Sequence, residues 1–410
     1  MNYFYKVDKN RLISFAVIWV NGGSCLDRKD KRGINNILTT LLSRGCKGYD
    51  CFSLSDYVDS FGAEMYYETF EDGIMITLKS LQKYSDNLFP ILDLVINEPN
   101  LEENEFSLCK RNAINYLIKS RENPFNTALE NWRRITYVDH PYSNDTNGYL
   151  KDIDNINYSD VLDEYDDFKS RERTFLSNSI TKIYPQINTD EFNSKNKLEN
   201  NSKISKSENC ESLCKISTHH LDSNQVVLMI GNQTCPQYSK DYLILKLLES
   251  HLSFGMSSQL FKKLREDKGL TYEQGIYYPR RMQNAPFVIY LSASNQNALE
   301  AYKQIIEILE DIKNNLLKEK DIKLAKNKLY GFFLHTQQTL EERIIRKAQL
   351  IGFQLDLNFD LNLLNNLKNI KPEDIRETAR KYFSKPILSI VGKEELNQKI
   401  RYLWEKETNL

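Results

Sequence analysis

A polar segment near the middle of the chain limits what its 410 residues can fold into. Residues 186–213 are rich in Asn, Ser and Lys and almost free of large apolar side chains. Such a stretch buries too little apolar surface to offset the entropy lost on ordering. We therefore predict a linker at 186–213 between two domains, residues 1–185 and 214–410, each of ordinary domain size.

The two halves show the same order of predicted elements. Each begins with a run of β-branched and aromatic residues, at 14–20 and at 225–231, which predicts a strand. A helix follows in each half, over about 33–44 and about 239–253. Two further strands come next in each half. They are predicted at 64–70 and 73–78 in the first half, and at 271–278 and 286–292 in the second.

Long amphipathic helices and a short closing strand complete each half. Apolar residues recur at three- and four-residue spacing, which is typical of a helix with one buried face. In the second half they are Leu299, Tyr302, Ile305, Ile306, Leu309 and Ile312, and then Ile322, Ala325, Leu329 and Phe332. The closing strands are predicted at 174–177 and 387–391. The order favours an α+β fold of two tandem homologous domains, each a mostly antiparallel sheet covered by helices. No helix is recognised after the closing strand of the first half.

Composition excludes several classes of protein. The net charge is -1 and the basic residues are scattered among acidic ones, which argues against binding to nucleic acid or an anionic membrane. No apolar run approaches the roughly 20 residues of a membrane helix. The first residues lack the features of a secretion signal. The seven Cys follow no disulfide spacing, so we expect reduced thiols in a cytoplasmic protein.

Residues 255–272 carry the most specific motif of the chain. They read GMSSQLFKKLREDKGLTY. This resembles the G-x-S-S-x-L-F-x-x-[LV]-R-E-x-x-G-L-x-Y signature of the insulinase (pitrilysin) family of zinc metallopeptidases. Shorter segments of the first half fit the same family, namely Gly22-Gly23-Ser24, the helix from Gly33 to Gly45, residues 59–64 and His140-Pro141-Tyr142. The resemblance covers nearly the whole chain outside 186–213. It implies two homologous domains forming half of a clamshell, which pairs with a second such chain to enclose peptides.

The resemblance also shows what the chain lacks. The family's peptidases carry H-x-x-E-H, in which two His hold zinc on one helix face and Glu is the general base. These positions fall on Asn36, Thr39 and Thr40, which are poor zinc ligands and accept no proton near pH 7. The family's third ligand, a Glu, would fall near 115–117, which reads Asn-Tyr-Leu. We therefore expect no zinc and no peptide cleavage by this chain alone.

The second half keeps a different part of the family's chemistry. Non-catalytic subunits of two-chain members supply an Arg and a Tyr spaced R-x6-Y, and Arg265 and Tyr272 have that spacing. A phenol O–H can donate to the oxyanion that forms during hydrolysis, and a guanidinium can hold substrate carbonyls. The resemblance therefore implies a heterodimer with a homologous zinc-bearing subunit that acts on peptides, with Arg265 and Tyr272 acting in trans.

Two alternatives remain at this stage. Arg265 can be a surface cation near a helix end at which Gly269 supplies the turn, and Tyr272 an ordinary strand residue. The chain would then be a scaffold homologue with no role in turnover. A free-standing hydrolase with another nucleophile has no constellation of residues behind it.

Other histidines and cysteines offer no complete site. His219 and His220, close to Asp222, point to opposite sides of a strand and so rarely share a metal. We expect His140 to order a loop and His251 to pack within its helix, and His335 lies among apolar helical neighbours in the sequence. Cys210 and Cys214 have one-turn spacing but no second pair, and Cys46 and Cys51 lack a nearby His.

Overall fold

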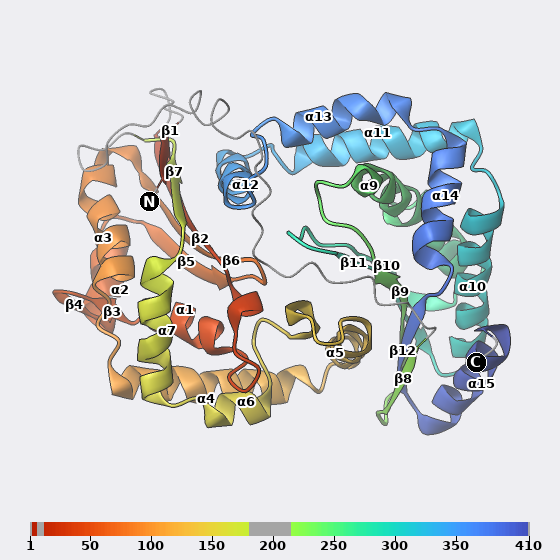
Figure 1. Ribbon diagram of the computed structural model, residues 1–410, viewed down its shortest axis with the longest axis horizontal. Helices are drawn as coiled ribbons and strands as arrows, with labels where there is room; N and C mark the ends of the chain where they lie inside the picture. The colour runs from red at the N-terminus through yellow and green to blue at the C-terminus, as the bar shows by residue number, and fades with distance from the viewer. Residues whose placement is uncertain (1, 6–11, 180–214, 409–410) are drawn as a thin grey trace. The chain divides into compact units, whose positions relative to one another are not determined.

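The computed structural model describes residues 2–5, 12–179 and 215–408. These residues group into two units. The first contains the described residues of 1–118, 144–203 and 336–359, and the second those of 119–143, 204–335 and 360–410. Each unit is built on one five-stranded sheet (Figure 1). The predicted linker at 186–213 lies outside the described residues, so the predicted division at that segment stays a prediction.

The sheet of the first unit has the strand order β1-β7-β2-β6-β5. All neighbours are antiparallel except β1 and β7, which run parallel. The strands are β1 (Asn2–Tyr5), β2 (Ile13–Asn21), β5 (Glu64–Thr69), β6 (Gly73–Leu81) and β7 (Arg173–Ser177). A separate two-stranded ribbon consists of β3 (Gly45–Cys46) and β4 (Tyr49–Asp50).

The sheet of the second unit repeats this arrangement strand for strand. Read from the corresponding edge, its order is β8-β12-β9-β11-β10. Only the pair β8 and β12, which corresponds to β1 and β7, is parallel among its described strands. The strands are β8 (Ile216–His220), β9 (Gln225–Gln233), β10 (Thr271–Tyr277), β11 (Pro286–Ser294) and β12 (Ile387–Gly392). The predicted α+β fold with two homologous, mostly antiparallel sheets is therefore confirmed.

Helices cover both faces of the first sheet. On one face Ala16, Ile18 and Val20 of β2 join a core that includes α1 (Ile34–Leu42). Further helices of the first half contribute to this core. They are α2 (Cys51–Ser60), α3 (Ser85–Asn97), α4 (Glu103–Ser120), α6 (Leu150–Asn155) and α7 (Tyr158–Ser170). On the opposite face Phe15, Val17 and Trp19 pack against α12 (Leu340–Gly352), which Figure 1 shows beside β7 and β2.

The second sheet is covered by a helix from the first half of the sequence. Helix α5 (Pro124–Thr136) packs on β8, β9 and β12. Trp132 of α5 is fully buried, and its indole N–H donates to the carbonyl oxygen of Ile387 at 3.1 Å. Other helices of this unit come from the second half. They are α9 (Lys240–Ser253), α10 (Ala298–Asn314), α11 (Glu319–His335), α13 (Phe359–Asn366), α14 (Pro372–Phe383) and α15 (Glu394–Thr408).

The two halves of the sequence thus exchange a helix. Helix α5 covers the second sheet and α12 covers the first, and each follows the long helix of its own half. The repeat in the sequence did not indicate this exchange, because periodicity shows which face of a helix is apolar but not which sheet that face covers.

One predicted core position on α11 is wrong. Phe332 is 42% exposed, and Phe333 is buried together with Ile322, Ala325 and Leu329. At 3.6 residues per turn, the eleventh residue after Ile322 returns to its face of the helix, whereas the tenth does not. Within the described residues, no helix has the length and apolarity needed to cross a membrane.

We predict that Trp132→Ala lowers the free energy of unfolding by about 3–5 kcal/mol, because it leaves a large cavity between α5 and the second sheet. Urea unfolding followed by circular dichroism measures this loss. Phe52→Ala, at a side chain that is 78% exposed, is the matched control and should change stability by less than about 0.5 kcal/mol. Equal losses in the two variants would contradict the packing role of α5.

Candidate functional site

Helix α1 begins at a position that only glycine fits. Gly33 has φ of 96°, and a Cβ there would lie 2.7 Å from the carbonyl oxygen of Asn147. The Asp27 carboxylate accepts hydrogen bonds from the backbone N–H of Gly33 at 2.6 Å and from that of Asn35 at 3.2 Å. A carboxylate at this end of a helix satisfies free N–H groups and interacts favourably with the helix dipole.

Helix α1 is regular, but the face that holds zinc in H-x-x-E-H peptidases carries no zinc ligand here. The apolar residues of α1 are buried in the core of the first unit, namely Ile34, Ile37, Leu38, Leu41 and Leu42. Asn36 is half-buried and Thr40 is exposed one turn later, so these two positions share the outer face. Thr39 is buried and turned toward Thr69 of β5.

All three side chains are engaged within the protein. The Thr39 hydroxyl donates to the Asn35 carbonyl oxygen at 2.7 Å, and the Thr40 hydroxyl donates to the Asn36 carbonyl oxygen at 2.9 Å. The Asn36 amide donates to Oδ1 of Asn147 at 3.2 Å. These positions therefore carry neither the imidazole nor the carboxylate groups that bind zinc, and their hydroxyls are already hydrogen-bonded to the preceding turn of the helix.

The third zinc position is equally unsuited. On α4, Leu117 is buried in the core, while Asn115 and Tyr116 are exposed. Residues 2–5, 12–179 and 215–408 contain no group of three or more His, Cys, Asp or Glu that could hold a metal ion. The residues present therefore do not fit the zinc ion used by H-x-x-E-H peptidases.

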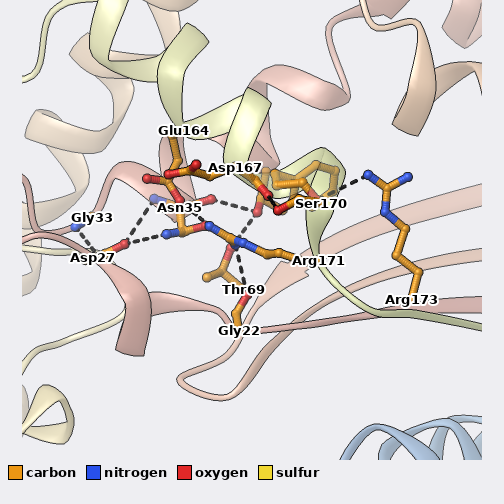
Figure 2. A network of polar contacts seen from close by, with 12 residues as sticks. Gly22, Asp27, Gly33, Asn35, Thr69, Glu164, Asp167, Ser170, Arg171 and Arg173 are labelled. Atoms are coloured by element: carbon orange, nitrogen blue, oxygen red, sulfur yellow. Dashed lines mark hydrogen bonds and ion pairs between the residues drawn. The ribbon is translucent and has the colours of Figure 1, made fainter. Parts of the chain in front are cut away.

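A buried polar network lies behind α1, and the sequence did not reveal it (Figure 2). The Asn35 amide donates to Asp27 Oδ1 at 2.8 Å, and its Oδ1 accepts from Arg171 Nη1 at 2.7 Å. Arg171 also donates to the Gly22 carbonyl oxygen at 3.0 Å and forms an ion pair with Glu164 of α7. The network joins the start of α1 to the end of α7, across more than 130 residues of sequence.

The carboxyl group of Asp27 is the electrostatically unusual member of this network. Burial raises its pKa to about 7, and this outweighs the hydrogen bonds from Asn35 and Gly33, which favour the charged form. The Asp27 carboxyl therefore changes charge close to neutral pH.

Arg265 lies on a short π-helix, η4 (Phe261–Glu266), in the second unit. Its guanidinium carbon is 5.4 Å from the centre of the Phe261 ring, within the range of a cation–π contact. Gly269, three residues after the end of η4, has φ of 59°, and the Leu270 N–H donates to the Leu264 carbonyl oxygen at 2.7 Å. Gly269 thus makes the turn that the sequence indicated.

Tyr272 projects from an irregular point of an edge strand. In β10, Thr271 pairs with Ala293 and Glu273 with Ser292, so Tyr272 is the extra residue of a bulge. Its side chain is 63% exposed. Bulges re-aim side chains and are common near active sites. The side chains of Arg265 and Tyr272 have no hydrogen-bond or ion-pair partner in the part of the chain that the structure describes.

The remaining candidates have structural surroundings. His140 Nδ1 accepts from the Tyr142 backbone N–H at 3.0 Å and Nε2 lies 2.6 Å from Gln283 Oε1, so His140 orders its loop as predicted. Burial raises the pKa of the Cys46 thiol to about 11, which keeps it protonated. His219 and His220 are exposed on β8, and His335 is exposed at the end of α11. Cys210 and Cys214 lie outside the described residues.

Comparison with known families identifies the chain. Residues 4–148 match the family model described as "Insulinase (Peptidase family M16)", and residues 179–329 match the one described as "Peptidase M16 inactive domain". The two models together cover most of the sequence. The chain belongs to the insulinase (M16) family.

Relatives and solved structures match over nearly the full length. An "Uncharacterized zinc protease" of Rickettsia felis is 22% identical, covering 91% of each chain. The "Non-peptidase homolog YmxG" of Helicobacter pylori is 19% identical, covering 90% of this chain and 87% of the relative. A crystal structure of a protease from Helicobacter pylori superposes with a TM-score of 0.81 at 17% identity, covering 95% of each chain, and shares the fold.

We predict that stability falls as pH rises from about 4 to about 7 because of Asp27. Its folded pKa, about 7, lies above the ordinary value of 3.8. The folded chain therefore holds a proton that the unfolded chain releases between these values. This contribution is complete below pH 4 and is lost as pH rises to about 7, with a slope of at most about 1.4 kcal/mol per pH unit.

Urea unfolding at several pH values between 4 and 8 measures this slope. Asp27→Asn should reduce this slope by up to about 1.4 kcal/mol per pH unit, the contribution of one proton, because the amide does not titrate. Asp56→Asn, at an exposed position of α2, is the matched control and should keep the wild-type slope. Identical slopes in wild type and Asp27→Asn would contradict the raised pKa.

Proposed function

We propose that this chain is the non-catalytic, substrate-binding subunit of a heterodimeric zinc metallopeptidase. Its partner is a homologous subunit that carries H-x-x-E-H, the third Glu and the zinc ion. The pair degrades or processes peptides. This chain contributes Arg265 and Tyr272 to the partner's active site.

One contrast within the chain carries the proposal. The side chains at the zinc positions are engaged by the protein itself, through the bonds of Thr39, Thr40 and Asn36 to neighbouring groups. The side chains of Arg265 and Tyr272, by comparison, are exposed and have no hydrogen-bond partner among the described residues. A bulge re-aims the side chain it carries, so Tyr272 is placed to meet a group outside this chain.

The chemistry of the two side chains suits a role in trans. Attack of zinc-bound hydroxide on a peptide carbonyl places negative charge on its oxygen, to which a phenol O–H can donate. A guanidinium has several N–H donors in a fixed plane and binds carbonyl oxygens of an extended peptide. Phe261 limits the directions in which Arg265 can extend, because the guanidinium lies over its ring.

The names of the relatives agree with a family in which the peptidase role varies. The Rickettsia felis relative is named a zinc protease, and the Helicobacter pylori relative a non-peptidase homologue. The scaffold alternative shares the lost zinc site but assigns no role to Arg265 and Tyr272.

Affinity purification of this chain from its native extract tests the partnership. We expect a homologue bearing H-x-x-E-H in equal amount, with about one zinc ion per pair by elemental analysis. Recovery of the chain alone, or with unrelated proteins and no zinc, would support the scaffold alternative.

We predict that Tyr272→Phe lowers kcat of the reconstituted pair by about 10²–10³, since loss of one oxyanion donor has this effect in comparable sites. Arg265→Ala should mainly raise KM. Initial rates with a fluorogenic peptide measure both. Tyr402→Phe, at a side chain of α15 that is 67% exposed, is the matched control and should leave turnover unchanged. Unaltered turnover with Tyr272→Phe would refute the role in trans.

A further inference from the structure

A hydrogen bond spans the bulge that carries Tyr272. The hydroxyl of Thr271, directly before Tyr272, donates to Oε1 of Gln274, two residues after it, at 2.8 Å. Thr271 is 7% exposed and Gln274 is half-buried, so water competes little for this bond. The bond therefore joins the two ends of the irregular stretch of β10.

This bond depends on the extra residue in the strand. In a regular strand, residues three apart point to opposite faces of the sheet. Thr271 lies opposite Ala293 of β11. Gln274 lies opposite Leu291, which is two residues from Ala293 and so points to the same face. Because residues directly opposite each other share a face, the side chains of Thr271 and Gln274 do so too. Without the bulge they would lie on opposite faces.

Packing holds the part of β10 that follows the bulge. Gly275 lies opposite Tyr290, and a Cβ at position 275 would lie 2.6 Å from the Tyr290 hydroxyl oxygen. The ring of Tyr290 makes an edge-to-face contact with Phe125 of α5, with the ring centres 5.0 Å apart. Tyr290 therefore packs closely over β10 beyond the bulge and restricts its movement.

Backbone hydrogen bonds hold the chain that precedes the bulge. The Leu270 N–H donates to the Leu264 carbonyl oxygen at 2.7 Å, and both side chains are buried. The Gly269 N–H donates to the Arg265 carbonyl oxygen at 3.0 Å. These bonds fix the chain from Arg265 to Leu270, so the bulge sets the direction of Tyr272 relative to Arg265.

We propose that Thr271 and Gln274 are positioning residues, whose hydrogen bond holds the bulge and thereby presents Tyr272 to the peptide bound by the pair. The inference rests on the proposed function, and it adds what sets the geometry of that site. Without the bond the bulge is free to shift along the strand, which moves the Tyr272 hydroxyl away from the oxyanion. A misplacement of about 1 Å can lower a rate by about 10².

Initial rates of the reconstituted pair test the effect on turnover. Thr271→Val keeps the shape of the side chain but removes the donor, and should lower kcat by about 10- to 100-fold with KM unchanged within about twofold. Gln274→Leu removes the acceptor and should have the same effect. Thr271→Ser keeps the hydroxyl and should retain at least about half of the wild-type kcat. Full kcat in both Thr271→Val and Gln274→Leu would overturn the proposal.

Thr234→Val is the matched control for loss of a buried hydroxyl. The Thr234 hydroxyl is buried and donates to the Ala285 carbonyl oxygen at 2.8 Å, a bond of the same length in the same unit. Ala285 precedes the start of β11, whereas Thr271 pairs near its end. Thr234→Val should therefore leave kcat unchanged. Circular dichroism confirms that each variant is folded, and Gln274→Leu decides if Thr271→Val is not.

A double variant separates positioning from general damage. Thr271→Val added to Tyr272→Phe should lower kcat no further than Tyr272→Phe alone, within about twofold, because the hydroxyl that the bond positions is already absent. Losses that multiply in the double variant would overturn the positioning role.

A spectroscopic measurement on the full chain alone needs no partner. With 3-fluorotyrosine in place of Tyr272, its ¹⁹F signal reports the surroundings of the ring. We expect a shifted or split signal in Thr271→Val and Gln274→Leu, and the wild-type signal in Thr271→Ser and Thr234→Val. The same signal in all of these proteins would overturn the proposal.

The outcomes separate the positioning role from the proposed function. If Tyr272→Phe lowers kcat and Thr271→Val does not, the positioning role is refuted while the proposed function stands. If the ¹⁹F signal responds to Thr271→Val but Tyr272→Phe leaves turnover of the pair unchanged, the proposed function is refuted, and with it any role of the bond in turnover.

Discussion

The central strand of each sheet is apolar on both faces, and the rest of the architecture depends on that constraint. In β2, Ala16, Ile18 and Val20 point to one face and Phe15, Val17 and Trp19 to the other. A strand of this kind has to be covered twice. The helices that follow β2 in the first half cover one face, and α12 from the second half covers the other. Helix α5 does the same for the second sheet.

This arrangement separates the residues that build α1 from those that would bind a metal there. Ile34, Leu38 and Leu42 hold the helix in the core, whereas Asn36 and Thr40 lie on its outer face. The outer positions can therefore change without loss of the fold. The buried network of Asp27, Asn35 and Arg171 fixes the start of the helix independently of any metal.

Much of the fold could be predicted from the sequence because its signals are local. Alternation and β-branched runs placed β2, β9, β6 and β11 within a few residues, and Gly269 marked the turn that follows η4. The exchange of α5 and α12 could not be predicted, since Trp132 and Ile387 are far apart in sequence and either sheet would accept an apolar helix face. Phe332 was misplaced because two adjacent phenylalanines satisfy nearly the same periodicity.

Only those residues of the candidate site that belong to a sequence motif could be proposed from the sequence. The positions 36, 39, 40, 265 and 272 follow from the resemblance of their segments to the family's motifs. The network behind α1 and the bulge at Tyr272 do not, because they depend on partners such as Arg171 and Ala293 that only the folded chain brings close.

The exchange also has a consequence for synthesis on the ribosome. The first sheet is complete in sequence when β7 ends at Ser177, but α12, which covers its second face, begins only at Leu340. At a synthesis rate of about 5–20 residues per second, roughly ten to thirty seconds pass between the synthesis of β7 and that of α12. Until then, no helix α12 is available to cover Phe15, Val17 and Trp19. During that interval a nascent chain presents an aromatic sheet surface to its surroundings, which is a surface that chaperones bind.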